Sequence, residues 1–88
     1  MQASTVDEAK LALATLQARV EAQGMLIALL LRHGSKPASE LQEIVRTAMA
    51  SFMDHQAGTG IPSGAIDAGR AVFTVAQEAL VARKAEGE

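Results

Sequence analysis

The side chains best suited to acid–base or metal chemistry are two histidines and a neighbouring aspartate, His33, His55 and Asp54. Each histidine lies near the predicted C-terminal end of a helix, where the helix dipole favours a partly charged imidazole. Neither belongs to a spaced ligand motif such as H-E-x-x-H, and the chain has no cysteine that could complete a zinc site. We therefore interpret both as exposed or helix-capping residues, and we expect no metal and no cofactor.

The segment Gly58-Thr59-Gly60 invites comparison with a phosphate-binding loop. A Walker loop needs a lysine and a Ser or Thr after its second glycine, and a dinucleotide loop needs a preceding strand. Both features are missing, so a flexible connection between helices is the better interpretation. No Ser/His/Asp or Cys/His set indicates a nucleophile, and no pair of carboxylates lies in an apolar setting. The sequence therefore predicts a protein that is not an enzyme.

The basic residues are dispersed along a chain whose formal net charge is −2. They are Lys10, Arg19, Arg32, Lys36, Arg46, Arg70, Arg83 and Lys84. A nucleic-acid-binding domain usually has a basic stripe and a high pI, so this distribution disfavours DNA as a partner. A small DNA-binding transcriptional regulator that touches phosphates through Arg46, Arg70 or the Arg32 and Lys36 end remains an alternative.

Length and composition predict one small helical domain. Of the 88 residues 49% are hydrophobic, but many of these are alanine, which forms helices well and adds little buried area. Residues typical of strands never alternate over a useful stretch. Because so short a chain has a thin core and no disulfides, oligomerisation is the common way to bury more area.

The same features bear on the cellular setting. The longest apolar run, residues 24–31, is far shorter than the roughly 20 residues that span a bilayer. The N-terminal segment lacks the basic-then-apolar order of a signal peptide. We therefore expect a cytoplasmic protein without membrane contact. An alanine-rich composition with a leading leucine heptad is similar to that of many small bacterial proteins.

Two breaks divide the chain into three predicted helices. The first break, residues 33–37, contains Gly34 and Pro37, and the second, residues 57–64, contains three glycines and Pro62. We predict helices at about residues 6–33, 39–56 and 64–83, followed by a frayed tail at residues 84–88. The predicted fold class is all-α, with a three-helix unit and a long N-terminal helix in a single domain, residues 1–88.

The first predicted helix carries a coiled-coil heptad in which position a begins at Val6. The a and d positions are Val6, Ala9, Leu13, Leu16, Val20, Gln23, Ile27 and Leu30. Parallel two-stranded coils favour β-branched residues at a and leucine at d, and the polar layer at Gln23 could fix register. A helix of this length spans about 42 Å, whereas a compact chain of this size has a radius of gyration of about 12 Å.

We therefore predict a homodimer that associates through this helix and forms a helical bundle, with parallel or antiparallel pairing left open. The predicted interface residues are Val6, Ala9, Leu13, Leu16, Val20, Gln23 and Ile27. From Gly24 onward the helix is apolar almost all round, so we expect the other two helices to pack around it there and the seam to be confined to residues 6–20. The alternative is a helix that breaks at Gly24 and folds into a monomeric bundle.

Two features of the second and third predicted helices bear on packing. Ala65, Gly69 and Ala76 are small enough to let another helix approach closely, although ordinary alanine-rich filler explains them equally well. The larger apolar residues Met49, Phe52, Met53 and Phe73 could line a groove between these helices that holds a peptide helix or a small ligand. The competing interpretation is that they form the core.

The leading hypothesis is a small non-catalytic interaction module. It would self-associate through the first helix and would scaffold or regulate an unidentified protein partner.

Overall fold

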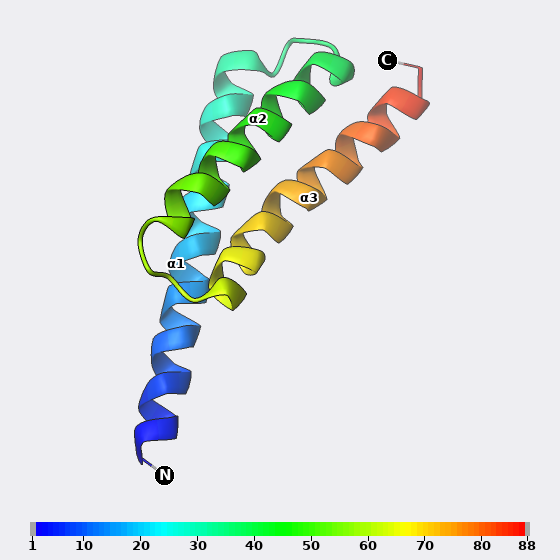
Figure 1. Cartoon of the computed structure of the whole chain (residues 1–88). Helices are drawn as coiled ribbons and strands as arrows, with labels where there is room; N and C mark the ends of the chain where they lie inside the picture. The colour runs from blue at the N-terminus through cyan, green and yellow to red at the C-terminus, as the bar shows by residue number, and fades with distance from the viewer. Residues whose placement is uncertain (1, 88) are drawn as a thin grey trace.

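The computed structural model describes residues 2–87, with side chains from residue 6 onward, and it contains three helices in this range. They are α1 (Gln2–His33), α2 (Ala38–Ala57) and α3 (Ser63–Ala85), as Figure 1 shows. No strand occurs among the described residues. The prediction of an all-α three-helix unit is confirmed. α1 runs without a break through Gly24, and α3 extends to Ala85, into the segment predicted to fray.

Proline and glycine set the helix boundaries. Pro37 and Pro62 directly precede α2 and α3 with φ of −59° and −56°, values close to those of helical backbone. Their carbonyl oxygens accept the first helical hydrogen bonds, for example from the backbone N–H of Leu41 at 3.0 Å. Gly60, in the loop after α2, has a φ of 75°, a backbone conformation that glycine adopts without steric cost. The positions of proline and glycine in the sequence therefore determine where both interhelical turns lie.

α3 is the central element of the arrangement. It packs along both α1 and α2, whereas α1 and α2 touch each other much less. The molecule measures 55 × 23 × 17 Å and has a radius of gyration of 15.3 Å, above the roughly 12 Å of a compact chain of this length. Figure 1 shows the first turns of α1 extending beyond the loop that joins α2 to α3. α2 and α3 therefore cover one side of α1 along part of its length.

The core of the described residues is small and rich in alanine. Its buried apolar residues are Ala18, Ala22, Ala38, Leu41, Val45, Phe52, Ala65, Phe73 and Leu80. The rings of Phe52 and Phe73 meet at its centre, with centroids 5.4 Å apart and planes tilted by 51°. Since four of these nine residues are alanine, most of the buried volume comes from a few larger side chains on α2 and α3.

Gly69 is the point of closest approach between α3 and its neighbours. A β-carbon at this position would overlap the phenyl ring of Phe52, at 2.6 Å from its Cε2 atom, and would lie 3.3 Å from the backbone oxygen of Ala18. The phenyl ring is itself buried, so it has little room to move aside. The expectation that small residues on α3 allow another helix to approach closely is therefore met at Gly69.

Replacing Gly69 by alanine should destabilise the fold. Overpacking against Phe52 costs about 1–3 kcal/mol, which exceeds the roughly 1 kcal/mol that alanine contributes through helix propensity. Urea denaturation at a fixed protein concentration measures the change. The matched control is Gly24→Ala, also in a helix interior but with open space around the added β-carbon, which should raise the free energy of unfolding. A stabilised Gly69→Ala variant would contradict the close packing described here.

Candidate interaction surface

α1 has two apolar faces that differ in side-chain size. The face that packs against α3 is formed by Ala18 and Ala22, both fully buried. Val20 lies between them in sequence, about 200° around the helix axis from Ala18, because successive residues turn by about 100°. It is 59% exposed. The alanine face is therefore directed into the molecule and the heptad face is directed away from it.

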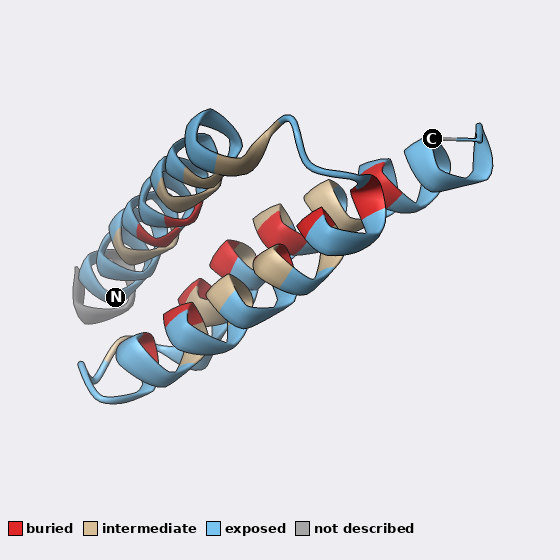
Figure 2. Ribbon diagram, turned by 90° about the horizontal axis from the view of Figure 1, so that it is seen from above, coloured by how far each residue is buried: buried red, intermediate tan, exposed pale blue. Residues whose placement is uncertain are grey.

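The heptad face forms one continuous exposed stripe, which we call the α1 stripe. Its residues are Val6, Ala9, Leu13, Leu16, Val20, Gln23, Ile27 and Leu30, all of them exposed. The six larger aliphatic members are each at least half exposed. Figure 2 shows the buried segments of α1 on the side that faces α2 and α3, with its outer side exposed. All seven predicted interface residues therefore lie on one face, and no part of the described chain covers it.

The expectation that α2 and α3 enclose α1 beyond Gly24 is wrong. Met25, Leu26 and Leu29 are half-buried against the other helices, but Ile27, Leu30 and Leu31 are exposed. Leu31, at 85%, is the most exposed large apolar side chain among the described residues. The physical reason is that two neighbours on one side can cover only part of the circumference of a helix. The α1 stripe therefore continues past Val20 to the end of the helix.

The four residues predicted to line a groove between α2 and α3 lie in or against the core. Phe52 and Phe73 are buried and contact each other. Met49 and Met53 are half-buried and pack against the same cluster. Here the side chains of the protein itself fill the space between α2 and α3.

An apolar hollow lies elsewhere, where all three helices meet. Its volume is about 170 Å³, and its walls are almost entirely apolar. The lining residues are Leu26, Leu29, Leu30, Leu41, Ile44, Val45, Ala76, Ala79 and Leu80. Sequence reasoning missed this hollow because each lining residue individually fits an ordinary core position. Apolar cavities of about 150 Å³ stay dry and admit a ligand of the size of benzene, so the hollow is large enough to be a binding site.

Gln56 is a buried polar residue that the sequence did not single out. It is 2% exposed, and its Nε2 atom donates a hydrogen bond to the carboxylate of Glu21, which joins α2 to α1. Its Oε1 atom has no hydrogen-bond partner within the described part of the protein. A cleft bordered by Glu21, Met25, Ser51 and His55 lies beside it. Glutamine is mostly exposed in folded proteins, so the sequence did not indicate that Gln56 would be buried.

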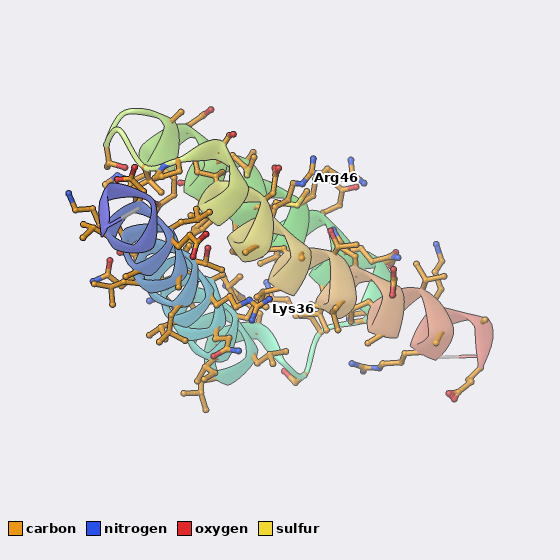
Figure 3. The ribbon with its side chains drawn as sticks, turned by 90° about the horizontal axis from the view of Figure 1, so that it is seen from below. Lys36 and Arg46 are labelled. Atoms are coloured by element: carbon orange, nitrogen blue, oxygen red, sulfur yellow. The ribbon has the colours of Figure 1, made fainter. Side chains whose placement is uncertain are left out.

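Two basic residues that the sequence singled out as possible phosphate contacts lie on different elements. Lys36, in the loop before α2, and Arg46, on α2, come from different elements and lie apart, as Figure 3 shows. Arg46 pairs with Glu43 at 2.8 Å on the solvent-exposed surface. Among the described residues, no three His, Asp or Glu side chains lie close enough to hold a metal ion.

No protein-family model, no curated protein and no solved structure matches this chain. None of the helices in residues 2–87 combines the length and the apolar character that crossing a membrane requires.

Proposed function

We propose that the protein is a non-catalytic helical interaction module that forms homodimers through the α1 stripe and scaffolds or regulates a protein partner. The observation that carries this proposal is the exposure of large apolar side chains on α1. In the described part of the chain ten such side chains are exposed, and eight of them belong to α1. Contiguous exposed apolar patches on soluble proteins commonly mark interaction sites.

The spacing of the stripe favours a second copy of this helix as the partner of α1. Its residues follow a heptad from Val6 to Leu30, a length of about 36 Å at 1.5 Å per residue. Such a seam fits side chains into the holes of an equally long helix with the same repeat. Burying the exposed half of one large side chain would contribute on the order of 1 kcal/mol, so the six such side chains in each of the two chains would together contribute roughly 12 kcal/mol. The total is comparable with the estimated cost of association, 4–15 kcal/mol.

Charges placed in the stripe should dissociate the dimer. The wild type is expected to sediment at about 18.4 kDa, twice the chain mass of 9.2 kDa, at micromolar concentration. The double variant Leu16→Glu, Val20→Glu should sediment as a monomer, because it would bury four carboxylates in the seam. Its helical circular dichroism should persist, since both positions are exposed in the single chain.

The matched control is Val75→Glu, Val81→Glu on α3. These valines are exposed to a similar extent, 65% and 55%, but lie outside the stripe. This variant should keep the dimer mass. A monomeric wild type would refute the proposal, and a Leu16/Val20 variant of unchanged mass would show that the interface lies elsewhere.

The apolar hollow supports binding of a small apolar ligand as a second candidate function. Its walls come from all three helices and offer a ligand almost no polar atoms, so recognition would rest on shape and desolvation. Selectivity for an apolar molecule follows from the cost of burying an unpaired polar group there.

Benzene is a suitable probe because its size matches the hollow. Titrating benzene should produce saturable shifts in the NMR methyl signals of Leu26, Leu41 and Leu80, which line the hollow. Ala79→Phe, which places a ring into the same space, should abolish these shifts. Methyl signals that do not respond in the wild type would exclude this second function.

A further inference from the structure

We infer that the α1 stripes of two copies pair in parallel and in register, with Gln23 facing Gln23 and Leu31 covered by the partner's Leu26. This inference rests on the proposed self-association and adds the orientation of the partner. Three residues on or beside the stripe distinguish the two orientations: Gln23, Leu31 and Arg19.

Gln23 is the one polar residue among the heptad positions of the stripe. In a parallel coil each d residue faces its own counterpart, so the two side-chain amides can donate to and accept from each other. In the antiparallel register that uses the whole stripe, Val6 lies opposite the partner's Leu30 and Gln23 lies opposite the partner's Leu13. Both amides would then face an aliphatic side chain without a partner, which is costly once water is excluded.

Leu31 occupies an e position beside the seam and is 85% exposed in the single chain. In a parallel coil an e residue contacts the g residue five positions earlier on the partner, which here is Leu26. Leu26 is half-buried within its own chain, and its exposed part would meet Leu31 and extend the apolar contact made by Ile27 and Leu30. In an antiparallel coil e faces e, and in the full-length antiparallel register the e position opposite Leu31 is residue 3 of the partner, which precedes the stripe. Parallel pairing therefore covers Leu31 with a leucine, whereas full-length antiparallel pairing places Leu31 beyond the end of the partner's stripe.

Arg19 occupies a g position, and its neighbour across the seam depends on the orientation. In the parallel arrangement it faces the partner's Gly24 at an e position, so no like charges meet. In the full-length antiparallel register g faces g near the centre of the stripe, which brings the two copies of Arg19 together. Like charges at such positions destabilise the pair and act against that register.

The position of α2 and α3 relative to the stripe is compatible with parallel pairing. α2 and α3 pack on the alanine face, opposite the stripe, so the two bodies lie on the outer sides of the central helix pair. In the parallel dimer both α1–α2 loops lie at one end and both projecting N-terminal segments at the other. Two apolar hollows, one in each body, would then lie at the same end of the assembly.

Single-cysteine variants test the orientation cleanly because the natural chain has no cysteine. Disulfides form when the two Cα atoms are about 4.4–6.8 Å apart. Under mild oxidation Ile27→Cys alone should form a covalent dimer at least tenfold faster than Val75→Cys, an exposed control outside the stripe. Equimolar mixtures of Ile27→Cys with Ala9→Cys and with Leu16→Cys should give no preferred mixed dimer.

The possible results separate this inference from the proposed function. Rapid Ile27→Cys self-cross-linking supports parallel pairing. Preferential cross-linking of Ile27→Cys to Ala9→Cys or Leu16→Cys would show an antiparallel dimer, which overturns the inference and leaves the self-association intact. A wild type that sediments as a monomer would overturn both.

Leu31→Ser gives a second readout that cannot be confused with misfolding, because this side chain makes little contact within its own chain. Parallel pairing predicts a dimer dissociation constant raised about tenfold, whereas an unchanged constant would contradict the contact with the partner's Leu26. Gln23→Leu should tighten the dimer and also permit the mixed cross-links, because the polar layer that selects the orientation is gone. A Gln23→Leu variant with weaker association and unchanged cross-links would contradict that role.

Discussion

The close contact between α1 and α3 is the constraint on which the remaining structure depends. Ala18 presents its backbone to Gly69, and the ring of Phe52 lies over the same glycine. Helices approach most closely where side chains are smallest, so α1 packs through its alanine face. The valines and leucines of the heptad, about half a turn away, are consequently left outside the fold. The exposed stripe is thus a direct consequence of how the core is built.

This arrangement gives a thin core and a large apolar surface. The larger buried apolar residues are Leu41, Val45, Phe52, Phe73 and Leu80, all on α2 and α3. Among its described side chains, α1 contributes only Ala18 and Ala22 to the buried set. A chain of this size has little surplus stability, because the fraction of surface that it buries is small. Covering the stripe with a second copy would add the apolar burial that the single chain lacks, which links the proposed association to stability.

The sequence predicted the helices better than their orientation. Glycine and proline at both breaks have fixed backbone preferences, so the three helices could be located from residue types. The heptad was equally visible. The sequence did not show which face of α1 packs into the fold. Leu16 and Val20 are more hydrophobic than Ala18 and Ala22, so hydrophobicity alone favours burial of the face that is exposed. The decision came from a close approach at Gly69, a property of two helices together that no single-helix pattern contains.

The apolar character of residues 25–31 misled the prediction for a related reason. A helix that is apolar all round is normally surrounded, but here Met25, Leu26 and Leu29 are half-buried, whereas Ile27, Leu30 and Leu31 are exposed. Helices of a second chain could surround residues 25–31 equally well. The sequence of one helix does not show whether its neighbours come from the same chain or from another. The burial of Gln56 could not be predicted from the sequence either, because it accompanies a hydrogen bond to Glu21 on a different helix, α1.

In the proposed dimer, folding and self-association would use opposite sides of one helix. Self-association would use the stripe, whereas the fold uses the alanine face, so pairing need not disturb the contacts around Phe52 and Gly69. The outer surfaces of α2 and α3 would stay free in the dimer, because both lie away from the stripe. The proposed dimer would therefore present two equivalent copies of these surfaces to a further protein partner. Two linked sites raise the effective affinity for a partner with matching geometry, even when each contact alone is weak. A small protein, whose surface offers little area for one strong binding site, gains affinity when dimerisation links two weaker sites.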